Sequence, residues 1–485
     1  MRETTLLIKF LSGPLAFTIF YFLSFDGLTR PAHLVSATFI WAVLWWVTQP
    51  VPWMITALLP LIIFPVFGVM NITATASLYG QPLLFWVIGL SLFGYAVQKH
   101  GLAKRFAITL LSMKGVAHST HTLLFFYMLA TAVISMFVSD AAVVAIMMPV
   151  GLSLLSYFRS RAGTGGCRNL GNFIALGTLY ASVAGGVATI AGTPPSPAVI
   201  AVLEKLTGET IGWFRWMKVG IPLFLVLLVM TYYMLRYFFP PEFTAIPGGG
   251  QEFLRGEAKS LGKMNRGEKN VLAIFIAMII MLTVPSIAPF VFGDQHPITI
   301  GLIQALPIYT VPPVVLLLLF ALPTDVKKGE FTLMWRDVAE HAPWNIAFLS
   351  TGAVAMVEAL SKFGFADFMK SNFAAVSISA DTLPFLAALF GAVMTEFTTA
   401  TATVTILGNV LIPAASQIGF NPASIAMLLS NVAMGMIFPW SGPLCALAFA
   451  SGEIKLNDMI RIGLVAHAAF AVTAALMHLA FASVF

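Results

Sequence analysis

The sequence predicts an all-α membrane protein with about 11 transmembrane helices and two re-entrant hairpins. Of its 485 residues, 59% are hydrophobic and only 9% are charged, whereas soluble domains carry roughly 25% charged residues. Apolar stretches of about 20 residues, the length that crosses a bilayer, recur from end to end. Two further apolar stretches are interrupted by small or polar residues, and these predict the hairpins.

The expected crossing helices are separated by loops that carry most of the charge. We place them at residues 6–23, 34–48, 54–69, 82–97, 172–191, 217–237, 271–290, 298–322, 344–360, 424–438 and 463–485. The first stretch contains Arg2 and Lys9 near its start and has no small-residue cleavage site, so we expect a retained helix rather than a signal peptide.

The two expected hairpins span 122–158 and 383–415. Each half is short for a full crossing, and each pair is broken at its centre. Backbone that leaves the helix at membrane depth is tolerated only where it is buried in protein or lines a wet cavity. Two such interrupted segments in corresponding halves indicate the binding site of a secondary transporter.

Sequence identities at one constant offset indicate an internal repeat. The matched pairs are Phe85 with Phe348, Gly89 with Gly352, Ala96 with Ala359, Lys99 with Lys362, Gly101 with Gly364 and Ala103 with Ala366. We therefore expect scaffold helices in 1–81, a first repeat in 82–237, a linker in 238–270, further scaffold helices in 271–343 and a second, inverted repeat in 344–485.

Most of the 26 lysines and arginines fall on one side when each hairpin returns to its own side. The positive-inside rule then predicts a cytoplasmic N-terminus, an external C-terminus and a cytoplasmic linker. We therefore read the net charge of +6 as membrane topology rather than as a nucleic-acid surface. The two cysteines, Cys167 and Cys445, are far apart and indicate neither a disulfide nor a zinc site.

The first hairpin tip contains an acidic residue, Asp140. A carboxylate near the bilayer midplane costs about 2.5–3.5 kcal/mol on insertion scales, so its presence suggests a role. The Ser135 and Ser139 hydroxyls and loop carbonyls can join it in an oxygen cage for Na⁺. A proton carrier and a purely structural acid are the alternatives.

The second hairpin tip is rich in hydroxyls. Five threonines fall within 395–403, and a second membrane acid, Glu396, lies among them. Threonine hydroxyls can merely bond to backbone carbonyls of their own helix, but together with a helix N-terminus they offer donors to a carboxylate. Glu396 is equally compatible with a structural pairing to a helix end or a hydroxyl.

Other polar residues suggest structural roles. Glu358 and Lys362 are spaced for an ion pair within one helix. We expect His467 and His478, on the last expected helix, to have no carboxylate neighbours, which favours packing or interface roles over a proton relay. Motifs of membrane metalloproteases, serine hydrolases, P-loop and dinucleotide-binding enzymes are absent from the sequence, so an intramembrane enzyme is a remote alternative.

Several ordered motifs resemble those of the divalent anion–sodium symporter family, the INDY-like dicarboxylate transporters. These are W-W-V-T-Q-P-V-P at 45–52, T-A-L-L-P at 56–60, K-H-G-L at 99–102, G-T-P-P at 192–195 and T-E at 395–396. The resemblance covers nearly the whole chain. It implies a homodimer, an elevator-type transport domain, and a Ser-Asn-Thr sequence at each tip that binds substrate carboxylate and Na⁺ together.

The tips depart from that family pattern. The first is Ser139-Asp140-Ala141 and the second is Thr399-Ala400-Thr401, so both amide donors are missing. The later Thr of the second Gly/Pro break is Gly442. An ionised Asp140 beside a dianion would repel it unless a cation or a proton neutralised the carboxylate.

The residues and the resemblance together assign a site on both repeats. The expected substrate-binding residues are Ser139, Asp140, Thr193, Pro194, Thr399, Thr401, Ser441 and Gly442. The expected sodium ligands are Ser135, Ser139, Asp140, Gly192, Thr395, Thr398 and Ser441. The expected function is sodium-coupled symport of a small di- or tricarboxylate across the inner membrane. Proton coupling, exchange, and transport of sulfate, a monocarboxylate or a less charged solute remain alternatives.

Overall fold

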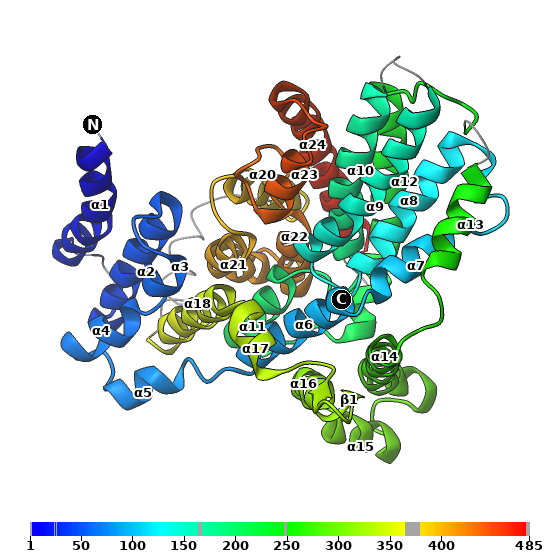
Figure 1. Cartoon of the computed structure of the whole chain (residues 1–485). Coiled ribbons are helices and arrows are strands. Elements are labelled where there is room, and N and C mark those ends of the chain that lie inside the picture. Colours follow the sequence, from blue (N-terminus) through cyan, green and yellow to red (C-terminus); the bar gives the residue numbers. More distant parts are fainter. Residues whose placement is uncertain are drawn as a thin grey trace.

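The computed structural model is helical apart from one small β-hairpin in the part of the chain that it describes (Figure 1). It describes residues 2–23, 25, 27–162, 167–246, 250–363 and 379–481. Gly364 and Ala366, which belong to the expected repeat, lie outside these residues.

The N-terminal helices form a group at one side of the molecule in Figure 1. They are α1 (Arg2–Phe22), α2 (Arg30–Thr48), α3 (Trp53–Thr56), α4 (Leu59–Val66) and α5 (Ile72–Ser77). The Asn71 side chain accepts a hydrogen bond from the Ala74 N–H at 2.8 Å and thereby caps α5.

The first half continues with a long helix, a helical hairpin and a broken helix. Its helices are α6 (Pro82–Lys99), α7 (Leu102–Leu111), α8 (Thr120–Ser135), α9 (Asp140–Ala162), α10 (Arg168–Gly186), α11 (Pro195–Thr207) and α12 (Trp213–Phe238), with the 3₁₀ helix η1 (Val116–His118) before α8. Prolines in the first turn of α6 and α11 suit these starts, because proline lacks an N–H that would be unpaired there.

The middle of the chain contains the linker and a second peripheral group. Its elements are α13 (Gly250–Ser260), α14 (Arg266–Phe292), α15 (Pro297–Ala305), η2 (Ile308–Thr310), α16 (Val311–Ala321), β1 (Pro323–Asp325), β2 (Glu330–Phe331) and α17 (Trp335–His341). The two strands pair antiparallel. Asn265 and Glu268 form a capping box that starts α14.

The second half has elements of the same kinds in the same order as the first. They are α18 (Trp344–Lys362), the hairpin helices α20 (Leu383–Thr395) and α21 (Ala400–Gln417), the broken helix α22 (Pro422–Val432) and α23 (Pro443–Ala450), and α24 (Leu456–Ala480). The ends of α6 and α18 coincide with the matched residues Lys99 and Lys362.

Eight helical segments of the described chain are long and apolar enough to cross a membrane. Two expected spans are interrupted instead: 54–69 divides into α3 and α4, and 424–438 stops being helical after Val432. The expected span 298–322 divides into α15 and α16, although the two together form one of the eight segments. Pro52, Pro60, Pro307 and Pro422 accompany these starts and breaks, because proline favours a helix start and disfavours a helix interior.

In the packed core, one part of each broken helix contacts its own half and the other part contacts the opposite half. In the first half, α10 packs against its own hairpin (α8 and α9), but α11 packs against α21 and α22 of the second half. In the second half, α22 packs against α20 and α21, whereas α23 packs against α9 and α10. Each break is therefore enclosed by elements of both halves.

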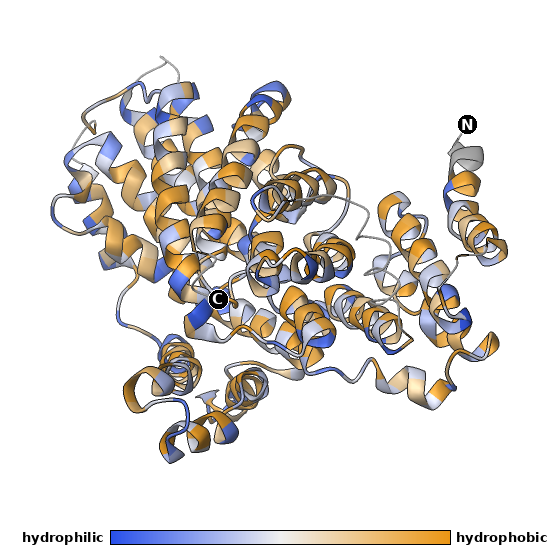
Figure 2. Cartoon of the chain, turned by 180° about the vertical axis from the view of Figure 1, so that it is seen from behind, coloured by the Kyte–Doolittle hydropathy of each residue, from blue (hydrophilic) through white to orange (hydrophobic). Residues whose placement is uncertain are grey.

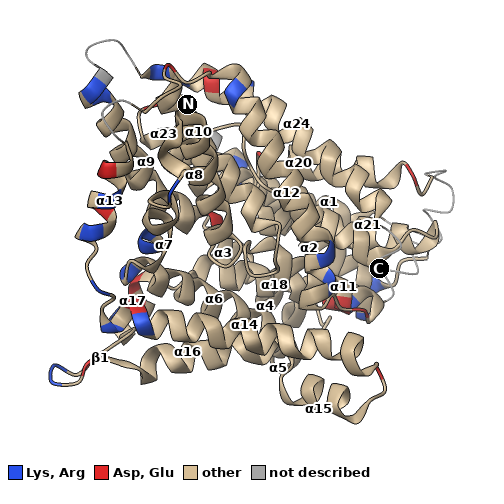
Figure 3. Ribbon diagram, turned by 90° about the vertical axis from the view of Figure 1, so that its right-hand side faces the viewer, with Lys and Arg blue, Asp and Glu red and all other residues tan. Residues whose placement is uncertain are grey.

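The surface chemistry fits a protein embedded in lipid. Apolar residues cover much of the outside of the helices in Figure 2, and exposed large apolar side chains include Ile276, Ile280, Phe290 and Leu317. Charged residues gather around α7, α13, α17 and the β-hairpin in Figure 3. Contiguous apolar surface of this extent faces a membrane or a partner rather than water.

Candidate functional site

The tip of the first hairpin places a carboxylate at a helix N-terminus. α8 ends at Ser135 and α9 begins at Asp140. The Ser135 hydroxyl donates a hydrogen bond of 2.8 Å to Asp140 Oδ1, and the Asp140 residue is only 4% exposed. The Ser139 carbonyl accepts the first helical hydrogen bond of α9, from the Val143 N–H at 3.0 Å. The positive end of the α9 dipole favours a negative charge at this position.

The unwound segment 187–194 between α10 and α11 lies directly against this tip. The Thr189 hydroxyl donates to the Met136 carbonyl of the tip. A Cβ added to Gly192 would lie 2.8 Å from the Ser135 carbonyl oxygen. A Cβ added to Gly186 would lie 2.6 Å from Thr193 Cγ2 and would also collide with Asp140 Oδ1. Glycine is required at both positions because backbone and tip approach this closely.

A small pocket brings several expected site residues together. It has a volume of about 20 Å³ and is lined by Ser139, Thr193 and Pro194, with Trp86 and Ser91 of α6 on its other side. A cavity needs about 10–15 Å³ to hold one water molecule. The pocket therefore has space for about one water-sized species.

Asp140 is distinguished from the other buried acids of the described chain by its lack of a basic partner. Glu268 pairs with Arg105 at 2.7 Å and Glu396 pairs with His467 at 2.7 Å, whereas the ion pairs of the described residues do not include Asp140. Its hydrogen-bond partner there is the neutral Ser135 hydroxyl. A buried carboxylate without a counter-charge is costly, so this one requires a proton or a cation.

The threonines of the second tip divide into bound and free hydroxyls. Thr399 caps α21 by accepting from the Ala402 N–H at 3.1 Å, and the Thr398 hydroxyl lies 2.7 Å from that of Thr403. The Thr395 and Thr401 residues are buried, but their hydroxyls have no hydrogen-bond partner within the described parts of the chain. Among the described residues of this tip, these two hydroxyls therefore remain free to donate to a ligand.

Glu396 is held by four hydrogen-bond donors. The backbone N–H groups of Met436 and Ile437 donate to it at 2.9 and 3.2 Å, the Ser441 hydroxyl donates to Oε2, and His467 Nδ1 lies 2.7 Å from Oε1. The expectation that His467 has no carboxylate partner is thus wrong. The two residues are 71 positions apart in sequence, and only tertiary packing brings α20 and α24 together. The structural pairing considered for Glu396 is confirmed.

Hydrogen bonds also join the two halves beside the site. The Thr193 hydroxyl lies 2.8 Å from the Ser196 hydroxyl, which lies 3.0 Å from the Ser430 hydroxyl of α22. Ser441 and Gly442 end the unwound segment 433–442 before Pro443. The Ser441 hydroxyl also accepts from the Phe438 N–H at 3.1 Å, so protein groups already occupy it.

A second expected pairing differs in the structure. Glu358 pairs with Lys205 of α11 at 3.1 Å and accepts from the Gln81 amide at 2.8 Å, rather than pairing with Lys362 one turn away. His478 lies against Ser424 and Asn431, as the packing role predicted. Glu358 pairs with Lys205 rather than with Lys362 of its own helix because α11 packs directly on α18.

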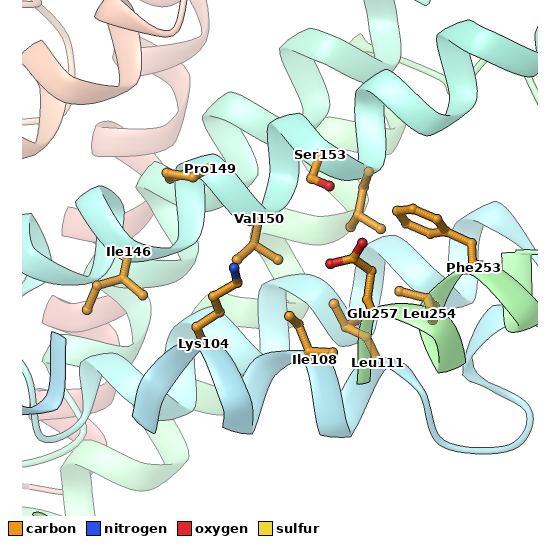
Figure 4. A pocket seen from close by; sticks show the side chains of 11 residues that line it. Lys104, Ile108, Leu111, Ile146, Pro149, Val150, Ser153, Phe253, Leu254 and Glu257 are labelled. Atoms are coloured by element: carbon orange, nitrogen blue, oxygen red, sulfur yellow. The ribbon is translucent and has the colours of Figure 1, made fainter. Parts of the chain in front are cut away.

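A larger pocket lies away from these residues. It has a volume of about 120 Å³ and is enclosed by α7, α9 and the linker helix α13, with Lys104, Ser153 and Glu257 among its lining residues (Figure 4). None of the expected site residues lines it. Its position beside the linker separates it from the hairpin tips.

Sequence reasoning missed several residues of the site. Gly186 offered a signal, since it ends a buried helix beside Gly185, and Ser91 and Ser430 are polar residues within apolar helices. The only sequence signal for His467 was that histidine is rare in a membrane helix. Their partners are remote in sequence, so no spacing rule could connect them.

Comparisons with known proteins place the chain among membrane transporters. A family model described as the sodium:sulfate symporter transmembrane region matches residues 6–485. Sodium-dependent dicarboxylate transporters named SdcS are similar to the chain. The one from Staphylococcus saprophyticus is 28% identical over 467 residues, covering 94% of this chain and 88% of the relative. One from Staphylococcus aureus is 28% identical over 470 residues, covering 94% and 87%.

Two solved transporter structures share the fold at low sequence identity. MtrF from Neisseria gonorrhoeae, described as representing a class of antimetabolite efflux pumps, has a TM-score of 0.56 and 12% identity, covering 93% of this chain and 95% of that chain. The YdaH transporter of Alcanivorax borkumensis has a TM-score of 0.50 and 14% identity, covering 84% and 87%. At such identities the likeness concerns the fold alone.

Proposed function

This chain belongs to the sodium:sulfate symporter family, and we propose that it transports a small dicarboxylate together with Na⁺ across the inner membrane. It is a multi-pass membrane transporter rather than an enzyme. The dicarboxylate assignment follows its SdcS relatives.

One observation carries the sodium assignment: Asp140 is buried at a hairpin tip without a cation among the described residues. Na⁺ is a hard cation that prefers oxygen ligands, as other hard cations do. The Ser135 hydroxyl contacts the Asp140 carboxylate, and Gly192 lies close to the Ser135 carbonyl. These groups, together with the Ser139 hydroxyl, would supply the oxygen ligands. The bound ion would also neutralise the charge that would otherwise repel a dianion.

The substrate would bind between the two tips. Thr401, Thr399 and the N-terminus of α21 offer donors from one side, and Thr193 and Pro194 at the start of α11 lie on the other. The packing of α11 against the second half and of α23 against the first half supports a site shared by both halves. The second-tip sodium ligands Thr395, Thr398 and Ser441 are a weaker assignment, because Thr398 and Ser441 already bond to other side chains.

The movement would be of the elevator type. The hairpins, the broken helices, α12 and α24 would form the moving unit, and α1–α6 with α14–α18 the scaffold. The pocket beside the first tip has a volume of about 20 Å³, so a dicarboxylate would enter it only after its lining residues move apart. From the family resemblance we further propose re-entrant hairpins in inverted orientation and a homodimer. The positive-inside rule supports a cytoplasmic N-terminus and an external C-terminus.

Uptake by purified protein in proteoliposomes tests this function. With Na⁺ and pH gradients imposed separately, labelled succinate should accumulate under the inward Na⁺ gradient and not under the pH gradient alone. Uptake driven by the pH gradient in the absence of Na⁺ would instead make Asp140 a proton carrier. Accumulation of sulfate but not of succinate would replace the substrate and keep the coupling.

A further inference from the structure

An apolar cavity of about 230 Å³ lies beside the tip of the first hairpin. Val133, near the end of α8, and Phe137 and Val138, in the tip itself, line it. The same short segment contains Ser135, whose hydroxyl donates to Asp140 at 2.8 Å. An occupant of this cavity would therefore contact the segment that carries the candidate sodium site.

Another wall of the cavity belongs to two helices outside the hairpin. Phe93 of α6 and Leu272 and Phe275 of α14 line it there. The Phe275 ring contacts rings on both walls, with its centroid 6.0 Å from that of Phe93 and 4.9 Å from that of Phe137. In the proposed movement, α6 and α14 belong to the scaffold and the hairpin belongs to the moving unit, so the cavity is lined by both.

The chemistry of the cavity excludes a polar occupant. The described residues that line it are all apolar. A buried water molecule needs about two to four polar partners, and an apolar cavity of about 150 Å³ stays dry and binds small apolar molecules instead. The ligand must therefore be apolar where it enters the cavity.

The bilayer is the source of such a ligand. Phe106 of α7, which also lines the cavity, is 41% exposed, and Ile276 of α14, one turn after Leu272, is 51% exposed. Both belong to the apolar outer surface of the helices, which faces lipid. Because a lining side chain reaches that surface, the cavity is open there, where phospholipid acyl chains are the surrounding medium.

A lysine near the cavity attracts a negative headgroup. Lys269 lies in the first turn of α14, three positions before Leu272, and it is exposed. It belongs to none of the ion pairs of the described chain. Lysines beside the ends of membrane helices attract anionic lipids, so Lys269 can contact the phosphate of a lipid whose chain enters the cavity.

We propose that the cavity binds one acyl chain of an anionic phospholipid, whose phosphate contacts Lys269, and that the bound lipid holds the first tip against the scaffold. The inference goes beyond the proposed function and rests on its division into moving unit and scaffold. The chain contacts Phe137 of the tip together with Phe93 and Phe275 of the scaffold, and it loses one set of these contacts when the units move apart. A ligand favours the conformation that it binds better, so the lipid slows the movement.

A second, largely apolar pocket provides the matched control. It has a volume of about 240 Å³ and is lined by α20, α24 and Ile437. Val393 lines it two positions before the end of α20, as Val133 lies two positions before the end of α8. The described residues of this pocket all belong to the proposed moving unit, so a lipid bound there does not join the two units.

Photolabelling of the purified full chain tests the lipid site. The probe is phosphatidylglycerol with a diazirine in its acyl chain, diluted in vesicles of phosphatidylcholine, and mass spectrometry maps the labelled residues. Label should appear on residues of the first cavity. Val133→Phe, which fills the cavity from α8, should abolish this label without affecting the second pocket, whereas Val393→Phe should leave it intact. Lys269→Ala should reduce the label by about fivefold, and Lys259→Ala, at an exposed position of α13, should not.

Sodium-dependent uptake of labelled succinate tests the effect on the movement. Uptake by the wild type should slow as phosphatidylglycerol replaces phosphatidylcholine in the vesicles. Lys269→Ala should lose most of this dependence, and Lys259→Ala should keep it. Because the surface potential of the vesicles changes equally for all three proteins, only the bound lipid distinguishes them.

The possible outcomes separate the parts of the inference. If Val133→Phe does not fold, Ala103→Leu fills the cavity from α7 instead. Absence of label in the first cavity, or label that survives the filling variant, overturns the lipid site, and label that is unchanged in Lys269→Ala overturns the headgroup contact. Equal lipid dependence of uptake in the wild type and Lys269→Ala overturns the effect on the movement. Labelling requires neither Na⁺ nor substrate, so a chain that is labelled but shows no Na⁺-dependent uptake overturns the proposed function and supports the lipid site.

Discussion

Lys205 Nζ of α11 lies 3.1 Å from Glu358 Oε2 of α18, and the Gln81 amide at the start of α6 donates to the same carboxylate oxygen at 2.8 Å. In the proposed elevator, α11 belongs to the moving unit and α18 to the scaffold. This ion pair therefore bridges the surface along which the two units would slide.

Linking Lys205 to Glu358 should stop transport. In a chain whose native Cys167 and Cys445 are replaced, Lys205→Cys/Glu358→Cys joined by a short bifunctional thiol reagent should lose nearly all uptake and recover when a cleavable linker is cut. Both charged side chains are about one-third exposed, and exposed ion pairs contribute only about 0.2–1 kcal/mol. The substitutions themselves should therefore not unfold the protein.

The pair Lys99 and Asp337 provides the control for that link. Their side chains are 2.7 Å apart, and both would belong to the scaffold, so linking the corresponding cysteines should leave uptake intact. If the variant with α11 linked to α18 takes up substrate at the same rate as the unlinked protein, these helices move together.

Asp140→Asn should separate three roles of this acid. If Na⁺ binds the carboxylate, the variant keeps an oxygen but loses a full charge, so its Na⁺ affinity should fall steeply while uptake persists at high Na⁺. If the acid carries a proton, asparagine mimics the protonated state, so proton-driven uptake should stop while exchange survives. Proteoliposome uptake across a range of Na⁺ concentrations distinguishes them, with exposed Asp294→Asn as the control. Unchanged transport and ion dependence would mean a structural acid.

Thr401→Ala should weaken substrate binding by about tenfold or more. The Thr401 hydroxyl has no partner in the described chain, and a hydrogen bond to a charged group contributes about 1.5–3 kcal/mol. Equilibrium binding of labelled succinate measures the loss, and Thr401→Ser should restore it. Thr405→Ala is the control, because the Thr405 hydroxyl only donates to the Thr401 backbone carbonyl one turn earlier. Equal affinity of Thr401→Ala and wild type would place Thr401 outside the site.

Gly186→Ala should abolish sodium-dependent uptake. The added Cβ would collide with Asp140 Oδ1 and lie 2.6 Å from Thr193 Cγ2, which would displace either the tip or the unwound segment. Gly301→Ala in α15 is the control, since its Cβ would meet no atom within 4 Å and alanine favours a helix. Na⁺-dependent uptake of both variants, at equal amounts of inserted protein, checks the expectation. Normal uptake by Gly186→Ala would show that tip and segment are less tightly joined.

Family membership and the helical membrane fold followed from the sequence, because apolar length and motif order are local properties of the chain. The positions of both hairpin turns also followed, since small and polar residues interrupt apolar runs there. The matched ends of α6 and α18 show how far the internal identities reach: they located corresponding helices but not their contacts. The breaks within 54–69 and 298–322 were missed because their hydropathy stays high across a proline-rich interruption.

The sequence by itself determined which chemical groups enter the membrane: two tip acids, a set of threonine hydroxyls and the glycine–proline breaks. Only the tertiary structure decided which acid has a basic side chain as its partner. Asp140 and Glu396 look alike in sequence, but the packing of α20 against α24 gives Glu396 a histidine partner and leaves Asp140 with a hydroxyl. The physical reason is that electrostatic compensation acts over a few ångströms in space, and residues 71 positions apart come that close only when the chain folds.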